Sequence, residues 1–206
     1  MKRNLMTLFL AVCLLLTLTA CGAKDEVQGE STSQTAVAEL KPTHYAEIDI
    51  ADYGTITVAL YGDAAPVTVA NFVSLAESGF YDGLTFHRIM AGFMMQGGDP
   101  MGNGRGGSDT KIKGEFAANG FDNPISHKRG VISMARSKSY DSASSQFFIM
   151  HADAAYLDGQ YAAFGCVTEG IEVVDAVCEA AKPTDNNGSI AKSAQPVITS
   201  ITVREA

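Results

Sequence analysis

The spacing of apolar and polar residues predicts a series of short β-strands. Apolar side chains alternate with polar ones over 46–51 and again over 55–60, on either side of an Asp-Tyr-Gly turn at 52–54. Alternation around a short turn is typical of a β-hairpin, which we expect over 46–61. The remaining strand-like runs are 86–90, 93–96, 130–135, 146–150, 163–167 and 196–203.

Two segments show helical spacing instead. In residues 65–79, Phe72 and Ala76 fall on one apolar face, and Asp63 stands where a capping side chain would accept hydrogen bonds from the first turn. A second apolar stripe runs through 170–181. We therefore expect two α-helices among about eight strands.

The predicted strands lie too close together along the chain for crossover helices, which favours antiparallel pairing. Eight antiparallel strands can close into a barrel whose interior is filled by side chains. The expected fold is therefore mostly β: a closed eight-stranded antiparallel β-barrel capped by two α-helices.

The first 20 residues have the layout of a secretory signal. Lys2 and Arg3 precede an uncharged, mostly apolar run from Leu5 to Ala20, which is short for a membrane span of roughly 20 residues. Leu-Thr-Ala-Cys at 18–21 resembles the bacterial lipobox, which implies cleavage before Cys21 and lipidation of its sulfur. An ordinary cleaved signal and an uncleaved anchor helix are the alternatives.

The sequence predicts three parts: a lipoprotein signal peptide over 1–20, a flexible tether over 21–44 and a folded domain over 45–206. The tether is polar, rich in small residues and without apolar periodicity. Removal of residues 1–20 leaves 13 basic and 23 acidic residues. This excess of acid argues against nucleic acid as a partner and leaves the lipid as the membrane attachment.

The sequence gives little support for a dinucleotide site, a metal site or a disulfide bond. The GxGxxG match at 102–107 is not followed by a helical stripe, so loop glycines are the better interpretation. No histidine stands at metal-ligand spacing from another histidine or a cysteine. Cys166 and Cys178 could pair in an exported domain, although two free, apolar thiols are the interpretation we favour.

The most informative stretch is FHRIMAGFMMQGGD at 86–99, because Arg88 and Gln96 interrupt two apolar strands. This stretch resembles the signature of the cyclophilins, the peptidyl-prolyl cis–trans isomerases. SQFFI at 145–149, GVISMA at 130–135 and the LDG and FG blocks at 157–165 resemble further blocks of that family, in the family's order. The resemblance extends from about Tyr45 to Val203.

The resemblance implies a catalytic role for Arg88, supported by Gln96 and Phe93, in turning Xaa-Pro peptide bonds. It implies no metal and no cofactor. The substrate-binding positions that it implies are His87, Met94, Ala135, Arg136, Gln146, Phe148, Tyr156, Leu157 and Tyr161.

Three positions depart from the common eukaryotic pattern. Tyr156 stands where many members have Trp, Arg136 replaces a frequent Asn, and Tyr161 replaces a frequent His. The first departure weakens the expectation of tight cyclosporin binding, and the other two change the edge of the groove.

We therefore expect a monomeric, exported isomerase, held by an N-terminal lipid at the outer face of the cytoplasmic membrane. Its expected partners are proline-containing peptides and unfolded exported proteins, whose folding it would assist. A non-catalytic module that binds proline peptides or acts as a chaperone is the alternative, and a structural envelope protein is a third interpretation.

Overall fold

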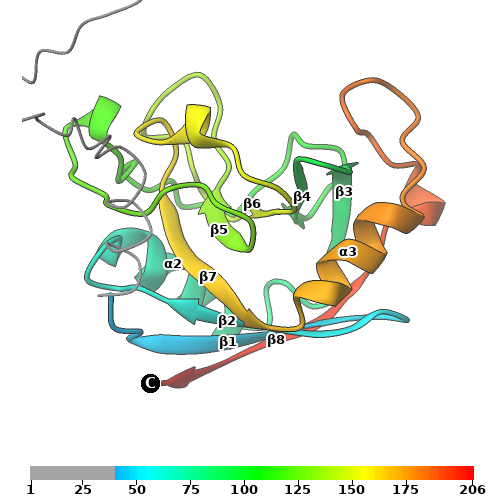
Figure 1. Ribbon diagram of the computed structural model, residues 1–206, viewed down its shortest axis with the longest axis horizontal. Helices are drawn as coiled ribbons and strands as arrows, with labels where there is room; N and C mark the ends of the chain where they lie inside the picture. The colour runs from blue at the N-terminus through cyan, green and yellow to red at the C-terminus, as the bar shows by residue number, and fades with distance from the viewer. Residues whose placement is uncertain (1–39) are drawn as a thin grey trace, which may run out of the picture.

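Eight β-strands form one antiparallel sheet in residues 40–206, the part of the chain described by the computed structural model (Figure 1). Their order across the sheet is β3-β4-β6-β5-β7-β2-β1-β8. The elements are β1 (His44–Ile50), β2 (Gly54–Leu60), α2 (Pro66–Glu77), β3 (Thr85–Met90), β4 (Met94–Asp99), η1 (Ala117–Asn119), β5 (Val131–Met134), β6 (Phe147–Met150), η2 (Ala155–Leu157), β7 (Ala163–Glu169), α3 (Ile171–Ala180), η3 (Lys192–Ala194) and β8 (Ile198–Glu205).

The sheet curls into an open half-barrel, so the prediction of a closed barrel was wrong. The two edge strands, β3 and β8, meet only at the isolated bridge between Thr85 and Val197 and at a few neighbouring backbone bonds. Farther along β3, the loop before β8 takes the outer edge, because Ile89 N–H donates to Gly188 and Ile190 N–H donates to His87. β8 itself continues along β1 on the other side.

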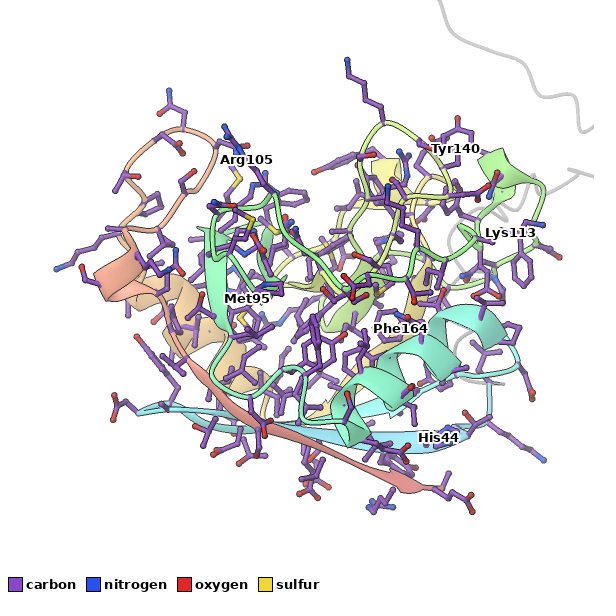
Figure 2. All side chains as sticks on the ribbon, turned by 180° about the vertical axis from the view of Figure 1, so that it is seen from behind. His44, Met95, Arg105, Lys113, Tyr140 and Phe164 are labelled. Atoms are coloured by element: carbon purple, nitrogen blue, oxygen red, sulfur yellow. The ribbon has the colours of Figure 1, made fainter. Side chains whose placement is uncertain are left out.

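The two predicted helices are present and lie on opposite sides of the molecule: α3 is in front in Figure 1, and α2 is in front in Figure 2, which is seen from behind. Helix α2 packs against β8, and α3 packs against β2. Asp63 does not cap α2. Instead, the buried carboxylate of Glu115 accepts the N–H groups of Val67 at 2.9 Å and Thr68 at 2.8 Å. The prediction of the cap was therefore wrong, since the capping acid comes from a distant loop.

The central strands are buried on both faces, which divides the core in two. Phe147 of β6 belongs to an aromatic cluster with Phe72 of α2 and Phe164 of β7, whose side chain lies in the interior in Figure 2. The next residue, Phe148, points to the opposite face and joins a smaller cluster with Met94. Alternate side chains of one strand thus build the core and the floor of a separate surface site.

The expected signal peptide, Cys21 and most of the expected tether lie outside the described residues. Strand β1 begins at His44, the last residue of that expected tether. Within the described part of the chain, no helix is long and apolar enough to cross a membrane. Cys166 and Cys178 are free thiols, as the sequence favoured.

Candidate active site

The candidate site is a row of side chains that crosses four neighbouring strands. Arg88 on β3 lies opposite Gln96 on β4, Gln96 lies opposite Phe148 on β6, and Phe148 lies opposite Ser133 on β5. Directly opposite residues point to the same face of a sheet. The strand register therefore explains why two polar residues occur at these points of apolar strands.

Arg88 is half-buried and held on several sides. Its Nε donates to the carbonyl of Asn187 at 2.7 Å, and its Nη1 donates to Gln96 Oε1 at 3.3 Å. The sulfurs of Met90 and Met94 lie 3.3 Å and 3.7 Å from Nη2 and Nη1. Burial lowers the pKa of Arg88, yet a guanidinium stays charged in proteins. The site thus holds a fixed, partly desolvated cation.

A chain of amide groups fixes the orientation of Gln96. Gln96 Nε2 donates to Gln146 Oε1 at 2.9 Å, and Gln146 Nε2 donates to the carbonyl of Gly106 at 2.7 Å. The chain leaves Gln96 Oε1 facing the guanidinium of Arg88. The loop around Gly106 is thereby connected to Arg88 through two side chains.

Beside Arg88 lies a small pocket of about 180 Å³. Nine of the twelve site residues predicted from the sequence line it, and we call it the proline pocket after the substrate that the resemblance implies. Its lining residues are Arg88, Phe93, Met94, Gln96, Ala135, Arg136, Phe148, Leu157 and Tyr161. Its apolar floor belongs to the smaller core cluster, so the pocket is continuous with the core.

The other three predicted residues lie outside the pocket. Gln146 contacts Gln96, as described above. Tyr156 is 72% exposed and stacks on Phe93 with ring centroids 6.1 Å apart. His87 is buried, and it lines a different cavity.

Arg136 closes one side of the proline pocket. Its Nε donates to the carbonyl of Gln160 at 3.0 Å, and its guanidinium lies 4.6 Å from the ring centre of Tyr161 and 5.2 Å from that of Phe116. Cation–π contacts of this kind hold an arginine against a surface. Arg136 and Tyr161, both departures from the common pattern, thus contact each other.

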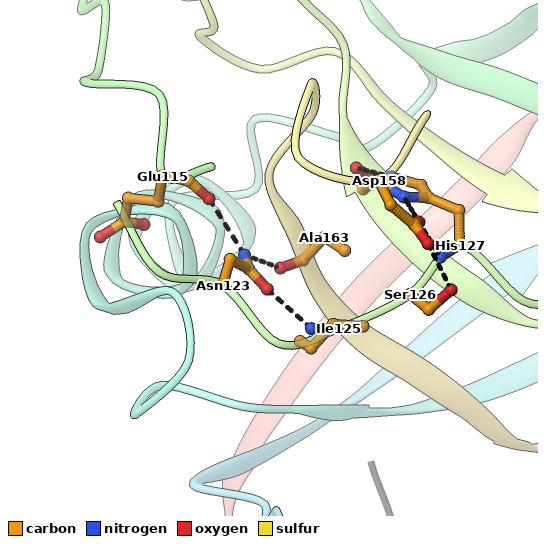
Figure 3. A network of polar contacts seen from close by, with 8 residues as sticks. Glu115, Asn123, Ile125, Ser126, His127, Asp158 and Ala163 are labelled. Atoms are coloured by element: carbon orange, nitrogen blue, oxygen red, sulfur yellow. Dashed lines mark hydrogen bonds and ion pairs between the residues drawn. The ribbon is translucent and has the colours of Figure 1, made fainter. Parts of the chain in front are cut away.

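A buried polar network that the sequence did not reveal supports the pocket floor, and Figure 3 shows its contact between His127 and Asp158. The ring of His127 stacks on Phe148, with centroids 6.0 Å apart. His127 Nδ1 lies 2.9 Å from Asp158 and its Nε2 lies 3.0 Å from the hydroxyl of Ser133. Burial lowers the pKa of His127 although Asp158 opposes this. The only sequence signal was Asp158, directly after the pocket residue Leu157.

The turn before β4 carries Phe93 and is fixed by His151. Gly92 N–H donates to His151 Nδ1 at 2.8 Å, and His151 N–H donates to the carbonyl of Phe93 at 2.9 Å. Because Nδ1 accepts, the proton of the neutral ring lies on Nε2, which is 3.2 Å from Asp175 on α3. His151 thus connects the pocket turn to helix α3.

Comparisons with a family model, with curated relatives and with solved structures all point to the same family. Residues 45–203 match the family described as cyclophilin type peptidyl-prolyl cis-trans isomerase/CLD. The chain is 47% identical over 154 residues to a peptidyl-prolyl cis-trans isomerase of Helicobacter pylori, covering 74% of this chain and 86% of that protein. It is 49% identical over 121 residues to peptidyl-prolyl cis-trans isomerase B of Bacillus subtilis, covering 59% and 81%.

Among solved structures, a cyclophilin-type isomerase of Cryptosporidium parvum, crystallised in the presence of the dipeptide Ala-Pro, superposes with a TM-score of 0.68. That match has 29% identity and covers 79% of this chain and 99% of the other. The family match, the relatives and the shared fold lead to one conclusion: the chain belongs to the cyclophilin-type peptidyl-prolyl cis-trans isomerases.

Proposed function

We propose that this isomerase binds proline-containing segments in the proline pocket and that Arg88 is its catalytic residue. One observation carries the proposal: the guanidinium of Arg88 lines a pocket of about 180 Å³ that has an apolar floor and is large enough for a proline ring. An Xaa-Pro bond whose ring enters this pocket brings its amide nitrogen toward a fixed hydrogen-bond donor.

The chemistry requires only such a donor. Rotation about the Xaa-Pro bond is slow because amide resonance imposes a barrier of roughly 18–20 kcal/mol. As the bond twists, the proline nitrogen becomes pyramidal and accepts a hydrogen bond better than the planar nitrogen does. Donation from Arg88 therefore strengthens in the transition state, which is what lowers a barrier.

The size of the required effect is compatible with one charged donor and its surroundings. Turnover in milliseconds requires the barrier to fall by about 5–7 kcal/mol. A preorganised donor in a site with little water can supply about 3–4 kcal/mol, and correct placement of the substrate supplies more. Gln96 and Asn187 contribute by holding the guanidinium in place.

The test is isomerisation of a short Ala-Pro peptide, measured by NMR exchange with residues 40–206. We expect acceleration by the wild-type domain and its loss in Arg88→Ala, with circular dichroism showing that both proteins are folded. A folded wild-type domain that accelerates nothing would reduce this chain to a peptide-binding module. Equal activity of the two folded proteins would exclude Arg88 as the catalytic residue.

We further propose that the protein is an exported, monomeric lipoprotein that assists folding of exported proteins at the outer face of the cytoplasmic membrane. The support is the order of signal, Leu-Thr-Ala-Cys and polar segment in residues 1–44. Intact-mass analysis of the mature protein should find Cys21 as a lipidated first residue, and Cys21→Ala should leave the membrane fraction. A mature N-terminus elsewhere would contradict the proposal. Light scattering of the purified domain would test the monomer.

A further inference from the structure

Another cavity, of about 800 Å³, is also lined by Arg88. It shares only Arg88 and Gln96 with that pocket, and the mechanism above does not use it. Its walls come from four places: the middle of β3, Gln96 of β4, the loop 101–105 and the segment 187–195 that precedes β8. We call it the side cavity.

His87 is the unusual residue of the side cavity. It is only 5% exposed, and within residues 40–206 neither of its ring nitrogens has a hydrogen-bond partner. Nearly all buried polar side chains are hydrogen-bonded, because an unpartnered one costs free energy. The ring lines the cavity beside Gly104, where an added Cβ would lie only 3.6 Å from His87 Nε2. The imidazole therefore lies in the cavity wall with both ring nitrogens buried, where a charge that enters the cavity changes the electric field at the ring.

The charges around the side cavity are positive. Arg88, Arg105 and Lys192 line it, and no aspartate or glutamate does. Arg105, on the face opposite β1 and β8 in Figure 2, and Lys192 take part in none of the ion pairs found in the described part of the chain. The whole chain carries a formal charge of −8. The charged residues that line the cavity are therefore all positive, whereas the chain as a whole is negative.

The two carboxylates near these cations stay ionised, and they are hydrogen-bonded within the loops that form the walls. Asp99 accepts the backbone N–H groups of Met101, Asn103 and Gly104 at 2.6–3.0 Å, which folds the loop that forms one wall. Asp185 accepts the N–H groups of Asn187 and Ser189 in the opposite wall. Both acids therefore shape the cavity, and neither lines it.

We propose that the side cavity binds an acidic side chain of the same peptide whose proline lies in the proline pocket. The two sites meet at Arg88 and Gln96, and an extended chain advances at most about 3.3–3.6 Å per residue. An aspartate or glutamate within about three residues of the proline can therefore reach the cavity. The proposal rests on the proposed function and makes the enzyme selective for acidic sequences around proline.

The experiment compares matched peptides at low salt. In one series with a single proline, Glu is placed at each of the three positions before and after it, and a second series has Gln at the same positions. Isomerisation by residues 40–206 is measured by NMR exchange. We expect a kcat/KM for Glu about three- to tenfold above that for Gln at one or two positions, as for partly exposed ion pairs. The ratio should approach one in 1 M salt, where charges are screened within about 3 Å.

Charge reversal assigns the effect to the cavity. Lys192→Glu should abolish or invert the preference and leave turnover of the Gln peptides unchanged, because Lys192 is exposed and does not line the proline pocket. Lys182→Glu is the matched control, since this exposed lysine does not line the cavity. In labelled protein, the Glu peptide should also shift the ring resonances of His87 more than the Gln peptide does.

The outcomes separate the two proposals. Gln peptides that are not turned over would contradict the proposed function. Normal turnover with a Glu-to-Gln ratio of one at every position would overturn the side cavity as a peptide subsite, as would a ratio unaffected by Lys192→Glu. Inorganic phosphate that shifts His87 while the ratio stays at one would assign the cavity to free anions and overturn the proposal.

Discussion

At the scale of single residues, the position of one guanidinium distinguishes this site from an ordinary sheet surface. Arg88 is held by a backbone carbonyl from a loop almost 100 residues away and by the side chain opposite it on β4. These bonds use Nε and Nη1, and the planar shape of the group fixes where the remaining donors point. A positive charge without this planar shape would not fix the direction of the remaining N–H donors.

Replacement of Arg88 by lysine should separate charge from direction. Arg88→Lys keeps a positive charge, but one ammonium cannot contact Asn187 and Gln96 and still point at the substrate nitrogen. We expect kcat/KM to fall about 10²- to 10³-fold, as when a preorganised donor is lost. The peptide exchange assay measures this, with thermal unfolding as the control for stability. A lysine variant with near-native activity would mean that charge suffices.

At the scale of elements, turns and loops carry the contacts that complete the site. The turn before β4 depends on His151, which accepts from Gly92 and lies near Asp175 of α3. We expect His151→Ala to raise KM about two- to tenfold with a small effect on kcat, because Phe93 loses its fixed position while Arg88 keeps its contacts. Steady-state exchange rates over a range of peptide concentrations test this. An unchanged KM would show that other contacts fix the turn.

Helix α2 depends on an acid that is distant in sequence. Glu115 is buried and accepts two backbone N–H groups and the hydroxyl of Thr68. Glu115→Ala should lower the free energy of unfolding by about 2–4 kcal/mol, because buried donors lose a charged acceptor. Urea unfolding measures the change. Asp63→Ala is the matched control and should change stability by less than about 0.5 kcal/mol, since the exposed Asp63 caps nothing.

The contrast between Asp63 and Glu115 shows what could be predicted from the sequence. The strands and the helices follow from local periodicity, which is visible along the chain, whereas the nine pocket residues follow from the resemblance of its motifs to those of a known family. The cap of α2, the contact of Asn187 with Arg88 and the network of His127 with Ser133 join distant segments. The barrel was expected to close because strand count does not reveal that a loop occupies the outer edge of β3.

At the scale of the whole molecule, two buried histidines should make stability depend on pH. Burial lowers the pKa of His87; the nearby charge of Arg88 also lowers this pKa, and that of Asp99 raises it. Burial likewise lowers the pKa of His127, although the hydrogen bond to Asp158 raises it. Near pH 6.5 and below, the unfolded chain therefore binds protons that the folded chain does not. Stability rises with pH wherever the unfolded state binds more protons, so the free energy of unfolding should fall as the pH drops below about 6.5.

The expected loss is up to about 1.4 kcal/mol for each histidine between pH 7.5 and 5.5. Urea unfolding at several pH values measures it. His87→Phe removes one titrating ring without breaking a hydrogen bond, because within the described residues that ring has no partner. The free energy of unfolding of the wild type minus that of the variant cancels the carboxylates common to both, and this signed difference should decrease as the pH falls toward 5.5. Parallel curves for the two proteins would show that His87 takes up its proton equally in the folded and unfolded states.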